Sequence, residues 1–191
     1  MINAIVMASG FSTRMGNNKL LLEYRGKTII ENTLDILKKS DFKEIIVVSQ
    51  YEEVLSIASK YSFKTVLNKK AYLGQSESIK LGIKNSSECE GYMFFVGDQP
   101  LLNKMDIDNL IKCFKDNNKY IIIPKYENKK GNPVIFPKCL KNKLLMLKND
   151  EKGKKVISEY DKIKYIYVKR ETLLDIDTKK DYENLINIYN S

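Results

Sequence analysis

The sequence predicts an α/β fold, a Rossmann-like three-layer α/β/α sandwich built on a mostly parallel mixed sheet. Two observations predict it. Short apolar runs alternate with amphipathic segments over the first two-thirds of the chain, in the β-α-β-α order of doubly wound sheets. The 191 residues are also enough to bury a sizeable core, and neither a linker nor an internal repeat divides them, so we expect one domain.

The first strand is expected at Ile2–Met7, an apolar run of strand length. The first helix is expected at Thr28–Lys39, where apolar side chains recur at the spacing of one helix face. The two patterns then alternate, with strands predicted at Glu44–Ser49, Lys64–Leu67 and Gly91–Val96 and helices at Glu52–Tyr61 and Ser76–Lys84. Ligands of such sheets bind at the carboxyl ends of the strands, so the loops that follow these strands are the candidates for a functional site.

The final third of the chain changes this rhythm. A helix at Asp106–Asp116 and a strand at Lys119–Pro124 still follow it, and the strand is predicted to end at its proline. Gly131–Pro137 is expected to be a short extended segment after a lysine-rich turn. Two short helices, a strand at Lys164–Val168 and a closing helix at Lys179–Tyr189 complete the prediction.

Composition and cysteine usage limit the class of protein. The chain is 43% hydrophobic and 30% charged, with no run of the ~20 apolar residues that cross a membrane. The first apolar run is too short for a signal peptide and no basic segment precedes it, so we expect a cytoplasmic protein with no membrane partner. Cys89, Cys113 and Cys139 form no CxxC pair and are expected to be buried reduced thiols.

The chain has no histidine, which argues against the common zinc sites and against Ser-His-Asp or Cys-His catalysis. Any metal would lie on oxygen ligands, which favours Mg²⁺ or Mn²⁺. The net charge of +9 permits anionic partners, and a basic module that binds RNA or an anionic surface is the non-enzyme alternative. That alternative lacks clustered arginine and an aromatic stacking pattern, so no nucleic-acid partner is expected.

The loop Ala8–Lys19, with the sequence ASGFSTRMGNNK, follows the first strand. Its glycines, Gly10 and Gly16, are six positions apart and Lys19 lies three further on, which excludes the P-loop. The dinucleotide fingerprint also fails, because Ser12 stands at its second glycine position. Backbone amides in a glycine-containing turn, with Arg14 and Lys19, predict an anion cradle; the alternative is two solvated charges after a strand.

Three further loops carry polar residues after predicted strands. Asp98 follows a hydrophobic strand and is placed to hold a divalent cation, although it could instead cap the next helix. Of Asp175 and Asp177, strand alternation allows at most one to face the site. In the Leu73–Gly82 segment, Ser76 or Ser78 could cap a helix while Gln75 stays free. An anion cradle and two carboxylates fit attack on phosphorus by a bound substrate, which needs positioning and charge neutralisation.

These motifs resemble one family closely. MASGFSTRMGNNK is similar to the signature L-A-[AG]-G-x-S-x-R-M-G-x-x-K of nucleotidyltransferases that attach a nucleotide to the molybdenum cofactor. The segments GQSESI, GDQPLL, GNPVIF and DIDTKKD resemble the cytidylyl branch of that family, in order along the chain. The resemblance implies the fold of the nucleotide-diphospho-sugar transferases, with a nucleotide-binding half at about residues 1–100 and an acceptor-binding half at about 101–191.

The implied reaction transfers CMP from CTP to the molybdopterin cofactor and releases pyrophosphate, with Mg²⁺ or Mn²⁺ as the cofactor. The alternatives are a guanylyltransferase for the same cofactor and a nucleotidyltransferase for another phosphorylated acceptor. The family pattern assigns catalytic roles to Arg14, Lys19 and Asp98 and metal binding to Asp98 and Asp177. It assigns nucleotide binding to Ala8, Ser9, Gly10, Ser12, Arg14, Gly16, Lys19, Gln75, Ser76, Ser78 and Asp98. The resemblance also implies a monomer that makes transient contact with a molybdoenzyme or its maturation chaperone.

Two departures from the family pattern bear on the substrates. Ser9 stands where alanine is usual in cytidylyl enzymes and glycine in guanylyl enzymes. The family's G-D-x-G-A-R segment is here NDEKGKK, one residue longer and without arginine. Lys154 and Lys155 of this segment are predicted to bind the acceptor phosphate, although lysine lacks the bidentate fork of arginine. A solvated helix face is the alternative for these lysines.

Overall fold

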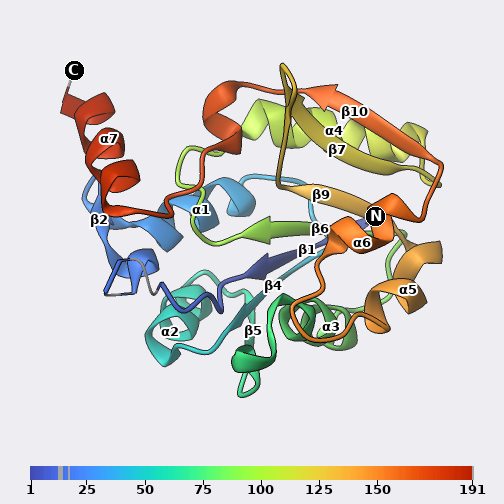
Figure 1. The fold of residues 1–191 in the computed structure, drawn as a ribbon, viewed down its shortest axis with the longest axis horizontal. Coiled ribbons are helices and arrows are strands. Elements are labelled where there is room, and N and C mark those ends of the chain that lie inside the picture. The colour runs from blue at the N-terminus through green and yellow to red at the C-terminus, as the bar shows by residue number, and fades with distance from the viewer. Residues whose placement is uncertain (13–14, 17, 191) are drawn as a thin grey trace.

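A computed structural model describes residues 1–12, 15–16 and 18–190, without the side chains of residues 188–190. Its central sheet has eight strands in the order β10-β7-β9-β6-β1-β4-β5, with β8 paired to β7 (Figure 1). The strands are β1 (Ile2–Met7), β4 (Glu44–Ser49), β5 (Lys64–Leu67), β6 (Gly91–Val96), β7 (Ile121–Tyr126), β8 (Lys129–Lys130), β9 (Val134–Pro137) and β10 (Ile163–Tyr167). β9 runs antiparallel to both neighbours, whereas the β1, β4, β5 and β6 ladder and the β7–β10 pair are parallel, so the sheet is mixed.

Helices cover both faces of this sheet. One hydrophobic cluster joins Ala4 and Val6 of β1 to α1 (Ile29–Lys38), α2 (Glu52–Lys60) and α4 (Lys104–Asp116). A second cluster joins Ile5 of β1 to α3 (Gln75–Asn85), α5 (Lys141–Leu145) and α6 (Gly153–Ser158). Successive β1 side chains thus enter opposite cores, as the two-residue period of a strand requires. The predicted three-layer α/β/α sandwich is confirmed.

The close packing of α3 depends on one glycine. A Cβ atom at Gly82 would lie 2.3 Å from Cγ2 of Ile5, closer than carbon atoms can approach. Glycine therefore lets the helix backbone rest directly on the central strand. The first turn of α3 then lies near the carboxyl end of β1, since Gln75 and Ser78 line the same cavity as Met7 and Ala8.

The chain between β1 and α1, and the C-terminal helix, add a smaller unit at one end of the sheet. A hairpin of β2 (Glu23–Tyr24) and β3 (Lys27–Thr28) follows the short 3₁₀ helix η1 (Lys19–Leu21). The final helix α7 (Lys179–Asn190) lies beside β2, as Figure 1 shows. The hydroxyl of Tyr182 donates to the carbonyl of Glu23 at 2.7 Å, which ties the C-terminal helix to the hairpin.

Three sequence-based expectations are wrong. The strand expected to end at Pro124 continues as β7 to Tyr126. Proline has no N–H to donate to a neighbouring strand, but its carbonyl still accepts a hydrogen bond, here from the amide of Gly131. α3 begins at Gln75 after Gly74, so neither Ser76 nor Ser78 caps it. All three cysteines are free thiols, but Cys139 is exposed and Cys113 only half-buried, which corrects the expectation of burial. Among the described residues, no helix is long and apolar enough to cross a membrane.

Candidate active site

A cavity of about 690 Å³ opens at the carboxyl ends of β1 and β6. It is lined by seven residues that the sequence predicts to bind nucleotide, namely Ala8, Ser9, Gly10, Lys19, Gln75, Ser78 and Asp98. These residues come from the loops after β1 and β6, from the 3₁₀ helix η1 and from α3. The fold thus brings most of the predicted nucleotide-binding set to one cavity.

The backbone of the loop after β1 is fixed by the loop after β4. Three consecutive carbonyls, those of residues 8–10, accept hydrogen bonds from three consecutive side chains, those of residues 49–51. The bonds join Ser49 Oγ to Ala8 O at 2.8 Å, Gln50 Nε2 to Ser9 O at 2.8 Å and Tyr51 Oη to Gly10 O at 3.0 Å. In a trans peptide the N–H points opposite to the carbonyl, so the amides of residues 9–11 point away from these partners. That orientation leaves these amides on the opposite side of the loop, as the predicted anion cradle requires.

Ser9 is held by a second set of hydrogen bonds. Its hydroxyl donates to the carbonyl of Val48 and accepts from the amide of Asn68, both at 3.2 Å. The same amide group donates to Ser78 Oγ at 3.2 Å, and Asn68 is almost fully buried. The proton of the Ser9 hydroxyl is therefore used inside the protein, and the group can offer only an acceptor to a ligand in the cavity.

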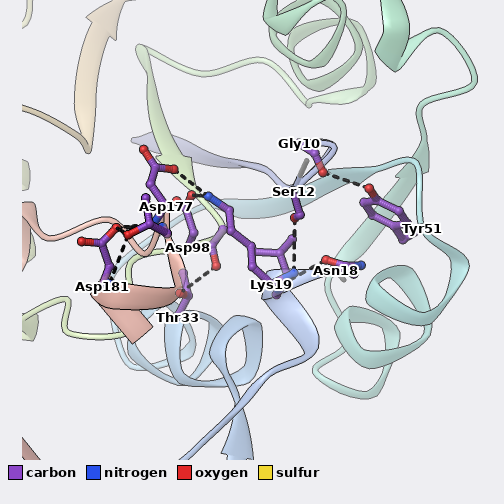
Figure 2. A network of polar contacts seen from close by, with 12 residues as sticks. Gly10, Ser12, Asn18, Lys19, Thr33, Tyr51, Asp98, Asp177 and Asp181 are labelled. Atoms are coloured by element: carbon purple, nitrogen blue, oxygen red, sulfur yellow. Dashed lines mark hydrogen bonds and ion pairs between the residues drawn. The ribbon is translucent and has the colours of Figure 1, made fainter. Parts of the chain in front are cut away.

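Lys19 joins the loop to two carboxylates, as Figure 2 shows. Its ammonium donates to Asp98 Oδ2 at 2.5 Å and to Asp177 Oδ1 at 2.9 Å. Its backbone amide donates to Ser12 Oγ at 3.2 Å, which anchors the start of η1. Burial of the ammonium opposes its charge, but the charges and hydrogen bonds of Asp98 and Asp177 outweigh that effect, so the pKa of Lys19 is raised above its ordinary value.

Asp98 lines the cavity and does not cap α4, because another residue caps that helix. Asn103 Oδ1 accepts from the amides of Met105 and Asp106, which removes the helix-cap alternative for Asp98. The second oxygen of Asp98, Oδ1, is buried with no hydrogen-bond partner among the described residues. A buried carboxylate oxygen without a partner is costly unless a ligand completes it.

The DID segment is positioned by backbone and capping bonds. The amide of Ile176 donates to the carbonyl of Asp98 at 3.0 Å, which places the two loops side by side. The carboxylate of Asp181 accepts from the amides of Asp177 and Thr178, and the Thr178 hydroxyl accepts from the Asp181 amide, so Thr178 and Asp181 cap the start of α7 reciprocally. Asp177 therefore faces Lys19.

Asp175 lies on the other side of this segment and lines a separate groove beside α7. Burial raises the pKa of Asp175 to about 6, and the nearby charge of Asp98 adds to the effect, against a hydrogen bond from Gln99. Alternation along the extended segment thus separates the two aspartates, as the sequence predicts. The choice of Asp177 over Asp175 agrees with the geometry.

The donor set at Asp98 and Asp177 fits a hard divalent cation. Both are carboxylates, and Asp98 Oδ1 is a buried acceptor with an empty hydrogen-bonding position among the described residues. No group of three or more acidic, cysteine or histidine side chains in the described part of the chain is arranged to hold a metal. Mg²⁺ commonly uses one or two protein carboxylates and takes its other ligands from water and substrate phosphates, so a pair of aspartates suits it.

Three predicted residues, Ser12, Gly16 and Ser76, are not among those that line this cavity. Arg14, also predicted, is outside the described residues. Gly16 is exposed with a positive φ of 77°, and Ser12, with a φ of 51°, supports Lys19. Ser76 is fully buried and donates to the carbonyl of Asn149 at 2.6 Å, so its hydroxyl ties α3 to the lysine-rich loop.

A second cavity of about 510 Å³ shares Met7, Gln75 and Lys152 with the first. Its walls are largely apolar and come from β6, β7, β9, α3 and α6. The structure separates the two lysines that the sequence groups together. Lys154 lines this cavity, whereas Lys155 is exposed and pairs with Glu151 at 2.5 Å.

Sequence reasoning missed several residues that build the site. The residues 49–51 carry no motif, and their role is visible only once β4 lies beside β1. Asn68 follows the short edge strand β5, and Asn149 and Asp150 approach Gly74 so closely that a Cβ there would lie 2.6 Å from Asp150 Cα. The sequence does show an asparagine after a strand (Asn68) and a glycine before a helix (Gly74). Such residues occur at ordinary turns as well as at ligand sites, so they could not have identified the site.

A mixed, mostly parallel sheet with a polar cavity at the carboxyl ends of its strands is the arrangement of α/β proteins that bind ligands at this edge. Comparison with known families makes the assignment specific. Residues 4–163 match the family described as the MobA-like NTP transferase domain, which covers most of the chain. The protein belongs to this family and is a nucleotidyltransferase.

Relatives of similar length support the assignment. The probable molybdenum cofactor guanylyltransferase of Thermococcus sibiricus is 28% identical over 95% of this chain and 95% of that protein. A homologue of Mycobacterium tuberculosis Rv0371c, from Mycobacterium sp. strain JC1, has a TM-score of 0.87 at 26% identity, over 99% of this chain and 97% of its own. Rv0371c from strain H37Rv, in complex with manganese, has a TM-score of 0.81 at 22% identity, over 97% of this chain and 98% of its own, which is a likeness of fold.

The tyrosine bond to the cradle gives a direct test. Replacing Tyr51 by phenylalanine removes the hydrogen bond to the Gly10 carbonyl and should weaken nucleotide binding about two- to tenfold, since one hydrogen bond contributes about 0.5–1.5 kcal/mol. Isothermal titration with CTP and with GTP measures the effect. Tyr61→Phe is the matched control. Tyr61 follows the C-terminal end of α2, and its hydroxyl donates to Asp35 of α1 and not to the loop after β1. Equal affinity losses in both variants would contradict the role of Tyr51.

Proposed function

We propose that this protein transfers a nucleoside monophosphate from a nucleoside triphosphate to the molybdopterin form of the molybdenum cofactor and releases pyrophosphate. The observation that carries the proposal is the Lys19 ammonium, held between Asp98 and Asp177 beside an amide-lined loop. This arrangement suits a triphosphate, whose charge must be neutralised where bonds change. The family and the relative in Thermococcus support the choice of acceptor.

The nucleotide is proposed to occupy the larger cavity. Its phosphates would accept hydrogen bonds from the amides of residues 9–11, and Lys19 would neutralise negative charge that develops at the α-phosphate. Arg14 is proposed to add a second positive charge. The base and ribose would lie toward Ser9, Gln75 and Ser78, which line the same cavity.

Asp98 and Asp177 are proposed to hold Mg²⁺ or Mn²⁺, and the related Rv0371c has been crystallised with manganese. When bound, the ion would withdraw charge from the phosphate oxygens. The protein's share of the chemistry is positioning. An oxygen of the acceptor phosphate forms a bond to the α-phosphorus, the bond from that phosphorus to the bridging oxygen breaks, and the electron pair leaves with pyrophosphate.

The acceptor is proposed to occupy the second cavity. Gln75 and Lys152 line both cavities, so a ligand in the second can reach a nucleotide in the first. Lys154, which lines this cavity, is proposed to bind the acceptor phosphate, and the apolar walls suit a planar ring system. The division into a nucleotide-binding half and an acceptor-binding half stays a prediction, and each cavity takes lining residues from both halves.

CTP is the nucleotide that the sequence motifs favour, through GQSESI and GDQPLL. GTP is the second candidate, because the Thermococcus relative is named a guanylyltransferase. Ser9 bears on the choice, since its hydroxyl can offer only an acceptor to the base. Both cytosine and guanine carry amino donors, so the side chain is compatible with either. A monomeric, cytoplasmic protein that hands its product to a molybdoenzyme or its maturation chaperone remains a prediction.

Pyrophosphate release tests the reaction. With Mg²⁺ and molybdenum cofactor present, we expect release with CTP to exceed release with GTP, ATP or UTP. Asp98→Asn should lower the turnover number at least about 100-fold, because it removes charge from the reacting centre. Asp108→Asn is the control, since Asp108 lies on the surface of α4 and pairs with Lys104. Faster release with GTP would overturn the choice of CTP, and no release with any nucleotide would overturn the function.

The separation of the two lysines gives a second test. Lys154→Ala should raise the KM for the acceptor roughly tenfold and leave the KM for the nucleotide unchanged, because hydrogen bonds to charged groups contribute about 1.5–3 kcal/mol. Lys155→Ala should change neither constant, because Lys155 pairs with Glu151 outside the cavity. Steady-state kinetics with each substrate varied in turn measures both. If Lys155→Ala had the larger effect, the acceptor would bind elsewhere.

A further inference from the structure

We propose that Lys19 is a latch on the metal site: in the nucleotide-free protein its ammonium occupies the position between Asp98 and Asp177, and a divalent cation binds tightly only after nucleotide phosphates draw the lysine away. The inference rests on the proposed function for the identity of the cation and the nucleotide. It adds an order of binding that the proposed reaction does not require.

The first observation is the geometry of the lysine. Its ammonium contacts Asp98 Oδ2 at 2.5 Å and Asp177 Oδ1 at 2.9 Å, and these two carboxylates are also the proposed metal ligands. Figure 2 shows the side chain reaching from η1 to the two aspartates. The Lys19 side chain is 11% exposed and that of Asp98 is 15% exposed, so water screens this pair weakly. The contact is thus an internal ion pair and differs from the exposed pairs on the surface.

The second observation concerns charge. Among the described residues, one ammonium lies against the carboxylates of Asp98 and Asp177. A divalent cation placed on the same two carboxylates would lie within a few ångströms of a positively charged lysine and would be repelled by it. The ammonium lies directly against both carboxylates, so it cannot share them with a second cation at close range. The cation and the ammonium therefore compete for Asp98 and Asp177.

The third observation is that the lysine can move while its backbone stays fixed. The amide of Lys19 is anchored by Ser12 and that of Leu20 by Asn18, which define the turn. The four-carbon side chain is flexible and carries a compact charge, so it can exchange one anion for another. Lys19 lines the cavity together with residues 8–11, so bound phosphates would offer it a nearby alternative partner.

Thermodynamic linkage then couples the two ligands. If phosphates remove Lys19 from the carboxylates, nucleotide raises the affinity for the cation, and the cation raises the affinity for nucleotide by the same factor. The unoccupied Asp98 Oδ1 is ready to accept the cation once the lysine has moved. The site would bind the metal ion tightly only when the nucleotide is bound.

Binding of Mn²⁺ alone tests the proposal. Free Mn²⁺ is counted by its electron paramagnetic resonance signal in titrations of the full chain without nucleotide. Lys19→Met removes the ammonium, so the dissociation constant for Mn²⁺ should fall at least about tenfold, within the usual range of coupling between sites. Lys19→Gln, which keeps a hydrogen-bond donor without the charge, should behave in the same way and serves if Lys19→Met does not fold.

Two controls separate the latch from a general loss of charge. Lys129→Met also removes a lysine near the acidic residues, because the charge of Lys129 interacts with Asp175. The ammonium of Lys129 donates to the carbonyl of Leu173. This variant should change the dissociation constant less than about threefold. The double variant Lys19→Met with Asp98→Asn should lose the tight binding, which locates the ion at Asp98.

Unchanged Mn²⁺ affinity in folded Lys19→Met and Lys19→Gln would overturn the latch, as would an equal gain in Lys129→Met. The outcome is independent of the transfer reaction, because no nucleotide or acceptor is present. A wild-type protein that releases pyrophosphate but shows no gain on loss of Lys19 would refute the latch alone. A protein that shows the gain but transfers no nucleotide would refute the proposed function alone.

Discussion

The alignment of β1 with its two parallel neighbours is the constraint on which the rest of the structure depends. Met7, the last residue of β1, pairs with Val48 of β4 and with Val96 of β6. The three strands end at one level, so the loops that leave them begin side by side. A slip of one residue would turn the side chains of β1 to the opposite cores and move the three loops out of reach of one another. The amide cradle and the lysine–carboxylate cluster both follow from this register.

The sequence predicts the parts of this arrangement that depend on local pattern. Apolar runs identify β1, β4 and β6, and Lys19, Asp98 and Asp177 stand in loops whose composition indicates anion and metal binding. Strand alternation separates Asp175 from Asp177, and the structure agrees, with Asp177 at Lys19 and Asp175 in a groove beside α7. Strand positions, the polar residues of individual loops and the alternation of side chains along one segment can therefore be predicted from the sequence.

The remainder depends on contacts between distant segments. The hydrogen bonds from residues 49–51 to the loop carbonyls exist only because β4 lies beside β1, and nothing in the letters SQY indicates them. The division of Lys154 from Lys155 depends on which side of α6 faces the second cavity. Pro124 misled the strand prediction, because a missing donor matters only where a neighbour needs it. The exposure of Cys139 likewise depends on how the chain after β9 packs against the rest of the fold, which the local sequence does not indicate.

The first cavity is lined by Lys19 and Asp98, and it shares Met7, Gln75 and Lys152 with the second. The account proposed for this enzyme is that loop amides, one lysine and two aspartates position a triphosphate against an acceptor. The measurement that tests this account most directly is mass spectrometry of the molybdenum cofactor after incubation with the protein, Mg²⁺ and an equimolar mixture of the four nucleoside triphosphates. The account predicts a cofactor heavier by one nucleoside monophosphate, CMP ahead of GMP. An unmodified cofactor, with the nucleotide transferred instead to a sugar phosphate or other phosphorylated acceptor supplied alongside, would contradict it.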